Sequence, residues 1–163
     1  MKYMLLETGF GCMGLVSSAT GLRHTFLPRS SKSEVLQLIA TEFPGAMLDN
    51  SAFGDLPDQL RKYFSGEKID FHCILDLADH TAFQQEVWKV TASIPYGETR
   101  SYSWVAERVG KRKAARAIGR AMATNPVPVI VPCHRVIGSD GGLRGFGGGL
   151  ELKQRLLDLE AKR

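Results

Sequence analysis

The chain of 163 residues lacks a long apolar run, which excludes a hydrophobic membrane-spanning helix. Such a helix needs about 18 or more apolar residues in succession, whereas the apolar stretch at residues 126–132 is interrupted by three prolines. The first acid stands at Glu7, so the beginning of the chain shows no apolar segment of a secretory signal peptide. We therefore expect a cytoplasmic protein.

Cysteine is also scarce. The three cysteines stand at positions 12, 73 and 133, and an odd number of widely spaced cysteines does not form a disulfide framework. Reduced thiols are the usual state in the cytoplasm. No two cysteines are separated by only two residues, the spacing typical of a zinc site. We expect neither a disulfide nor a metal.

The composition is that of a globular protein, with 44% hydrophobic and 23% charged residues. The net charge of +4 is unevenly distributed, because residues 1–80 carry −3 and residues 81–163 carry +7. In the run from 100 to 135, Glu107 is the only acid among eight basic residues. A basic half of this kind is typical of a protein that binds a polyanion, although a solvated basic face also accounts for it.

The first half of the sequence predicts an α+β region. Residues 1–27 have the pattern of strands, with apolar runs at 1–8 and 13–18 separated by glycines. Helical spacing predicts a helix at 33–43, with Ser31 or Ser33 as its N-cap. A second helix is predicted at 57–64 and a further strand at 69–77. We place a boundary within residues 76–82, which gives domains of residues 1–78 and 79–163.

The second half is predicted to be mostly helical. Residues 81–92 form a helix with Thr81 as N-cap, and residues 102–109 form a short helix that ends at Gly110. Further helices are expected at 114–124 and 150–161. Trp88 and Trp104 are interpreted as large apolar anchors in the core.

The two short helices around the basic turn at 110–113 predict a helix-turn-helix motif. Arg116 and Arg120 are four residues apart in the second helix and so share a face, while Ala115, Ile118 and Met122 can point into a core. Two arginines among small residues offer few side chains for reading bases. The pattern therefore favours DNA binding with little sequence preference, and the alternative is a plain helical hairpin with a basic corner.

Cys133 and His134 are the strongest candidates for chemistry. A base or cation near a cysteine favours the thiolate, the reactive form of the side chain, although a lone Cys-His pair also fits a buried structural cysteine. On an extended strand the two side chains would point to opposite sides, so a water or a bend must connect them. Prolines stiffen the approach to Cys133, and the glycines of residues 138–149 let backbone N–H groups approach a ligand. The position beside a basic helix-turn-helix points to chemistry on nucleic acid.

The run of residues 125–138, which contains Pro-Cys-His-Arg, resembles the active-site signature of the O6-alkylguanine-DNA alkyltransferases. The resemblance extends from about Phe83 to Glu160 and includes residues 94–99, 101–102, 114–119 and the Leu-Leu-x-x-Glu at 156–160. The first half resembles the family's variable N-terminal domain through residues 63–66. The implied fold is α+β: a small RNase H-like α/β domain, followed by a mostly helical domain with a helix-turn-helix.

The resemblance implies irreversible, single-turnover transfer of an alkyl group from O6-alkylguanine, and from O4-alkylthymine as a further candidate, to Cys133. His134 matches the base that accepts the thiol proton through a water, and Glu160 matches the carboxylate that orients this histidine. Tyr102 matches the hydroxyl that protonates guanine N3, and Asn125 the side chain that braces the active-site turn.

The resemblance also assigns binding residues. Arg116 matches the finger that replaces the flipped nucleotide. The further DNA-binding residues that we predict are Ser101, Lys113, Ala115, Arg120 and Arg135. The predicted alkylguanine pocket contains Pro128, Val136, Phe146 and Gly147, with the Val136 carbonyl accepting from the guanine amine.

The resemblance implies a monomer that binds double-stranded DNA with alkylated bases and that needs no cofactor. Some relatives hold zinc near the N-terminus, but Cys12, His24, His72 and Cys73 do not reproduce that spacing. Two alternatives remain open at this point. A Cys-His hydrolase would turn over repeatedly, and the basic helix-turn-helix argues against it. A non-catalytic alkyltransferase-like lesion-binding protein would lack the acceptor cysteine, and Cys133 argues against it.

Overall fold

The computed structural model describes residues 1–162. The chain divides into two compact units, of which the first is Met1–Leu77 and the second begins at Ala78. The two units are described separately below. No helix within residues 1–162 is long and apolar enough to cross a membrane.

The first unit is built on a four-stranded sheet in the order β3-β2-β1-β4. Its strands are β1 (Lys2–Thr8), β2 (Gly11–Ser17), β3 (Leu22–Arg29) and β4 (Met47–Leu48). β1, β2 and β3 pair antiparallel, and β4 pairs parallel to β1. The turn between β1 and β2 needs a glycine at 11, because its φ of 126° lies in the region that side chains disfavour. The strands predicted in residues 1–27 are confirmed.

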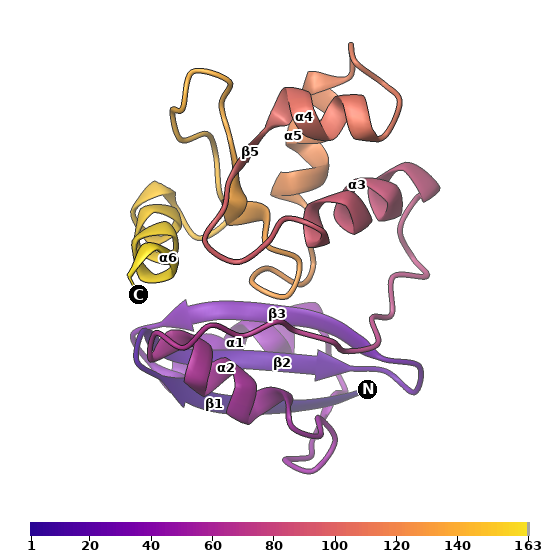
Figure 1. The fold of residues 1–163 in the computed structure, drawn as a ribbon. Helices are drawn as coiled ribbons and strands as arrows, with labels where there is room; N and C mark the ends of the chain where they lie inside the picture. Colours follow the sequence, from indigo (N-terminus) through magenta and orange to yellow (C-terminus); the bar gives the residue numbers. More distant parts are fainter. Residues whose placement is uncertain (163) are drawn as a thin grey trace. The chain divides into compact units, whose positions relative to one another are not determined.

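Two helices accompany this sheet, and Figure 1 shows α2 in front of it and α1, drawn fainter, behind it. α1 (Lys32–Glu42) begins at Ser31, whose hydroxyl accepts a hydrogen bond from the Glu34 N–H, so the predicted N-cap is confirmed. Val35 and Ile39 of α1 are buried against β2 and β3, together with Cys12, Val16 and Phe26. α2 (Leu56–Phe64) lies where the second helix was predicted.

The strand predicted at residues 69–77 is wrong. Only a single bridge forms there, between Leu22 and Leu75, with the Leu22 N–H donating to Ile74 and the Asp76 N–H donating to Leu22. The alternating apolar pattern is present, but the segment meets β3 only at the first residue of that strand. Ile74 is 77% exposed, so no second layer covers the segment there. The two-residue β4 is too short to leave a periodic pattern and was not predicted.

Within residues 78–162, the second unit contains four α-helices and a two-stranded parallel sheet. Its helices are α3 (Ala82–Ala92), α4 (Tyr102–Arg108), α5 (Ala115–Ala123) and α6 (Leu150–Ala161), and its strands are β5 (Arg100–Ser101) and β6 (Val136–Ile137). Thr81 caps α3 in a reciprocal capping box with Gln84. All four predicted helices are confirmed to within one residue at most ends.

α4 and α5 pack together and contact α3, and the backbone turns between them at Gly110, whose φ is 74°. Ile118 and Met122 of α5 are buried as predicted, but Ala115 is exposed and faces a cavity described below. Trp88 is buried and its Nε1–H donates to the Ala121 carbonyl at 2.8 Å. Trp104 is not a core residue. Its ring is half-buried, and the guanidinium groups of Arg100 and Arg108 lie over it, 5.5 and 5.0 Å from its centroid.

Candidate active site

The site begins with a braced turn at residues 125–132. The Asn125 side chain donates to the Val131 carbonyl at 2.9 Å and accepts from the Val127 N–H at 3.0 Å. The Val131 N–H donates back to the Val127 carbonyl, which closes the turn. Val129 has a φ of 76°, a strained value for a β-branched residue that persists only where its surroundings hold it. Asn125 therefore lies where a bracing role requires it.

Cys133 follows this turn as the first residue of a 3-10 turn, Cys133–Arg135. Its N–H donates to the Val131 carbonyl, so the braced turn fixes the backbone of the cysteine directly. The backbone therefore bends between Cys133 and His134, which do not lie on an extended strand. Burial raises the pKa of the Cys133 thiol, and the Asn125 side chain and the Lys153 charge oppose that rise. The thiol is therefore protonated at rest and needs a base when it reacts.

His134 and Glu160 lie together in the interior. His134 Nε2 donates to Glu160 Oε2 at 2.6 Å, and the two side chains are 0% and 1% exposed. Burial lowers the pKa of His134, and the contact with Glu160 only partly offsets that effect. Burial alone would raise the pKa of Glu160, but hydrogen bonds from His134 and Arg135 hold it far below its ordinary range. A neutral imidazole beside a carboxylate is an arrangement suited to accepting a proton.

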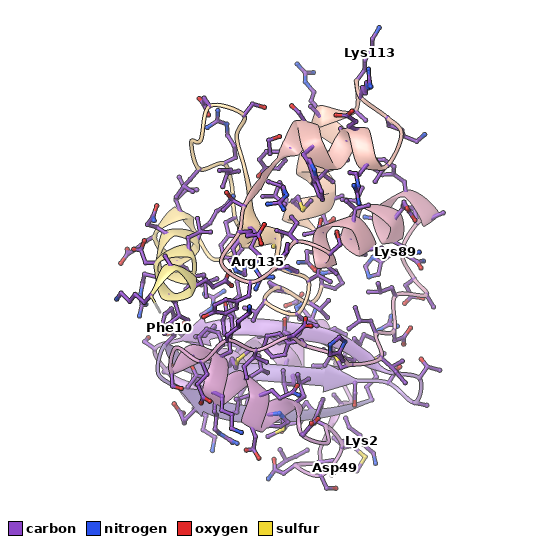
Figure 2. The ribbon with its side chains drawn as sticks, viewed as in Figure 1. Lys2, Phe10, Asp49, Lys89, Lys113 and Arg135 are labelled. Carbon is purple, nitrogen blue, oxygen red and sulfur yellow. The ribbon has the colours of Figure 1, made fainter. Side chains whose placement is uncertain are left out.

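Arg135, which the sequence assigned to DNA binding, is buried and ion-paired. Its side chain is 8% exposed, and its guanidinium donates to Glu160 Oε1 at 2.8 Å and to Oε2 at 3.0 Å. It also donates to the Ile94 carbonyl at 2.7 Å and lies over the Tyr96 ring. Figure 2 shows Arg135 among the side chains of the second unit, whereas Lys113 extends outward from its surface. The sequence analysis predicted DNA binding for both Arg135 and Lys113 as members of the basic run, because composition does not distinguish a buried basic residue from an exposed one.

Lys153 of α6 is a site residue that the sequence reasoning missed. Its side chain is fully buried, and its ammonium group donates to the Val136 carbonyl at 2.8 Å and to the Arg144 carbonyl at 3.2 Å. It also lies 5.8 Å from the centroid of the Tyr102 ring. One sequence pattern could have predicted its burial. Lys153 is three residues before Leu156, a spacing that places the lysine on the buried side of an amphipathic helix.

Tyr102 opens onto a cavity of about 740 Å³ between α4, α5 and the glycine-rich loop. The cavity is lined from α5 by Ala115 and Arg116, and from the loop by Phe146 and Gly147 among others. Burial raises the pKa of Tyr102, so its hydroxyl keeps its proton at neutral pH. Cavities of several hundred Å³ are typical of small-ligand sites, and this one is large enough for a nucleobase.

The structure brings some of the predicted binding residues together and separates others. Arg116 lines the cavity, whereas Arg120 lines a different hollow beside α3. Ser101 caps α4 by accepting from the Trp104 N–H. Pro128 and Val136 are buried and do not line the cavity, although the Val136 carbonyl accepts from Lys153. Among residues 1–162, no group of three or more His, Cys, Asp or Glu side chains is arranged to hold a metal.

This chain is similar to known proteins in sequence. Residues 82–162 match the family model of the 6-O-methylguanine DNA methyltransferase DNA-binding domain. A methylated-DNA–protein-cysteine methyltransferase of Methanosarcina barkeri is 41% identical over 98% of this chain and 97% of its own. The chain belongs to the methylated-DNA–protein-cysteine methyltransferase family. The corresponding protein of Mycobacterium tuberculosis is 53% identical over 71% of this chain and 69% of its own.

A solved structure supports the same membership. The crystal structure of Mycobacterium tuberculosis OGT in complex with DNA aligns with a TM-score of 0.84 and 41% identity, covering 99% of this chain and 93% of that one. The fold is therefore that of this methyltransferase family, with an α+β unit followed by a mostly helical unit that carries the helix-turn-helix.

Proposed function

We propose that this chain repairs DNA by moving an alkyl group from O6 of guanine to the sulfur of Cys133. The observation that carries the proposal is the placement of Cys133 between a braced turn and a buried His134–Glu160–Arg135 cluster. A Cys-His hydrolase would also need a base, but membership of the methyltransferase family does not favour it. A lesion-binding protein without an acceptor does not fit a chain that retains Cys133.

The proposed reaction is a displacement at carbon. The Cys133 sulfur bonds to the alkyl carbon as the carbon–O6 bond breaks, and the bonding electrons move into the guanine ring. The thiol proton passes to His134 through a water, and Glu160 stabilises the imidazolium that forms. Arg135 keeps Glu160 ionised and fixes its orientation, which makes Arg135 a positioning residue.

Tyr102 completes the proton balance on the leaving base. Its hydroxyl donates to guanine N3, so that the base leaves neutral. Lys153, close to the Tyr102 ring and fully buried, places a positive charge beside both the developing phenolate and the thiolate. Fixed charges in a site from which water is excluded stabilise developing charge more strongly than they do in water. We therefore add Lys153 to the proposed site as a positioning residue.

The base must leave the helix stack before Cys133 can reach its substituent. Extrusion costs a few kcal/mol, and least for a damaged, badly paired base. Arg116 lines the cavity that would receive the base, so its guanidinium can fill the gap left in the duplex. Lys113 and Arg120 are exposed and would contact phosphates, which hold the duplex without reading its sequence.

The proposal includes a monomer acting in the cytoplasm without a cofactor. Apart from the water that relays the thiol proton, every role in the reaction is assigned to a side chain of this chain. None of the side chains of the proposed site hydrolyses the thioether that forms on Cys133, so each protein molecule reacts once.

Intact-mass measurement tests the proposed function. Wild-type protein mixed with a duplex that carries O6-methylguanine should gain the mass of one methylene group, because the methyl group replaces the thiol proton, and peptide mapping should place the change on Cys133. Cys133→Ser should gain nothing yet keep most of its DNA affinity, because phosphate contacts hold the duplex. The proposal is wrong if the Ser variant repairs the lesion, or if the wild type releases a hydrolysed product over many turnovers.

A further inference from the structure

The cavity has a charged wall that the transfer of a methyl group does not require. Asp140 and Arg144, both in the glycine-rich loop, line it together with Tyr102 and Arg116. Arg144 Nη2 lies 3.1 Å from Asp140 Oδ1 and 3.2 Å from Oδ2. Two arginines and one carboxylate therefore line the space where the proposed function puts the alkylated base, and Arg144 is the one paired with that carboxylate.

The position of Arg144 is fixed by the loop around it. The Gly138 N–H donates to the Gly142 carbonyl, and the Gly142 N–H donates to Asp140 Oδ1 at 2.9 Å. The guanidinium of Arg144 lies so close to this turn that a Cβ added at Gly138 would be 2.8 Å from its central carbon, and one at Gly142 would be 2.6 Å from Nη1. Glycine at both positions therefore leaves room for the Arg144 side chain.

The backbone of the same residue is tied to the reaction centre. Lys153, whose ammonium group lies beside Tyr102, donates to the Arg144 carbonyl at 3.2 Å. The Arg144 charge is close enough to Tyr102 and Lys153 to shift the pKa of both. The Arg144 backbone is thus tied to Lys153, and its half-exposed side chain lines the same cavity as Tyr102.

We propose that Arg144 makes this site selective for alkyl groups that carry a carboxylate, such as the carboxymethyl group, and that Asp140 limits this selectivity. This inference rests on the proposed function. A carboxylate on the alkyl group would approach the Cys133 thiolate, and two like charges repel each other unless a cation is near. Arg144 offers that cation with a planar fork that matches a carboxylate. Asp140 competes for the same guanidinium.

The reaction itself keeps the same balance. The Cys133 sulfur bonds to the methylene carbon of the carboxymethyl group, the carbon–O6 bond breaks, and its electrons move into the guanine ring, which takes a proton from Tyr102. The products are S-carboxymethylcysteine and unmodified guanine. Arg144 touches only the carboxylate and takes no part in the proton transfers.

The test compares three lesions in one duplex sequence: O6-methylguanine, O6-carboxymethylguanine and the neutral, isosteric O6-carbamoylmethylguanine. Single-turnover rates at saturating protein give the ratio of the carboxymethyl rate to the carbamoylmethyl rate. General effects on folding, DNA binding or base flipping cancel in this ratio. Arg144→Gln should lower it roughly three- to five-fold, as for a partly exposed ion pair, and Asp140→Asn should raise it by a similar factor.

The chain offers a matched control. Arg61 and Asp58 form another exposed pair, 2.9 Å apart, in the first unit, and Arg61→Gln should leave the ratio unchanged. A ratio that is the same in Arg144→Gln as in the wild type overturns the inference, as does transfer of methyl but not carboxymethyl by the wild type. Failure of the wild type to transfer any of the three groups to Cys133 overturns the proposed function instead.

Discussion

Two sets of basic side chains in the second unit differ in their burial and in what their charges contact. Arg135 and Lys153 are buried, and each donates to acceptors at fixed distances of 2.7 to 3.2 Å. Lys113, Arg116 and Arg120 are exposed on the helix-turn-helix. A buried charge must be paired, because desolvation is costly, whereas an exposed one remains available to a polyanion. Under the proposed function, the same residue types therefore serve chemistry inside the unit and DNA binding on its surface.

The largest expected effect comes from Arg135→Met, which leaves Glu160 as a buried charge without its guanidinium. Removing one partner of a buried pair costs about 3–5 kcal/mol in the free energy of unfolding. Exposed Arg120→Met should change it by less than about 0.5 kcal/mol. Urea unfolding of the two variants measures this contrast. An Arg135→Met protein with wild-type stability but weaker DNA binding would return Arg135 to the DNA-binding surface.

The same pair gives the stability a pH dependence. Glu160 has a folded-state pKa below its ordinary 4.5, so its contribution is fully present above that value and is lost as the pH falls through the folded-state pKa. Arg135→Met should raise the pKa of Glu160 in the folded state. On acidification from pH 5 to the lowest pH at which the wild type unfolds reversibly, the variant should therefore lose less of its free energy of unfolding than the wild type does.

Glu160→Gln should slow alkyl transfer about 10- to 100-fold, the usual range for a group that orients a reacting ligand or base. DNA affinity should change far less, because the Glu160 side chain is buried inside the second unit. Single-turnover rates of Glu160→Gln equal to those of the wild type would remove Glu160 from the mechanism.

In the wild type, the single-turnover rate of alkyl transfer should stay flat from pH 8 to below 6.5. Burial lowers the pKa of His134 from 6.5, so the base stays neutral over this range.

Arg116→Ala should slow repair of a well-stacked lesion in duplex DNA roughly ten-fold, if the intercalated side chain stabilises the flipped state by about 1–2 kcal/mol. The reaction with free O6-alkylguanine needs no extrusion and should be nearly unchanged. The test of the flipping role needs four rate constants, which are those of the wild type and of the variant with each of the two substrates. An equal loss on both substrates would assign Arg116 to packing of the cavity wall.

The smallest effect is expected for Arg120→Ala, one turn further along α5 and outside the cavity. Loss of one phosphate contact should lower the magnitude of the slope of log K against log salt by about 1. Duplex sequence should matter little in either protein. A slope that does not change with Arg120, or a strong preference for one sequence, would contradict a phosphate-binding role.

The sequence predicts most of the fold, because caps and periodicity are local signals. Thr81, Ser31 and Gly110 mark helix ends that the structure confirms. The strand at 69–77 fails because a strand needs a partner edge, which a local pattern does not reveal. Arg135 and Trp104 are misplaced for the same reason, since burial depends on residues far along the chain. Lys153 was missed because buried lysines are rare, and only the acceptors at Val136 and Arg144 make this one tolerable.

The braced turn that precedes Cys133 has a consequence for the unfolded chain. Residues 126–132 contain three prolines, and the other four residues are all valine or isoleucine. Proline fixes φ and β-branching restricts χ1, so this segment has few conformations to lose when the protein folds. Val129 at positive φ adds strain of about 1–3 kcal/mol. Val129→Gly would relieve that strain, but it would raise the entropy of the unfolded segment and remove a buried side chain. Cys133 is therefore attached to a segment that has little conformational freedom even before folding begins.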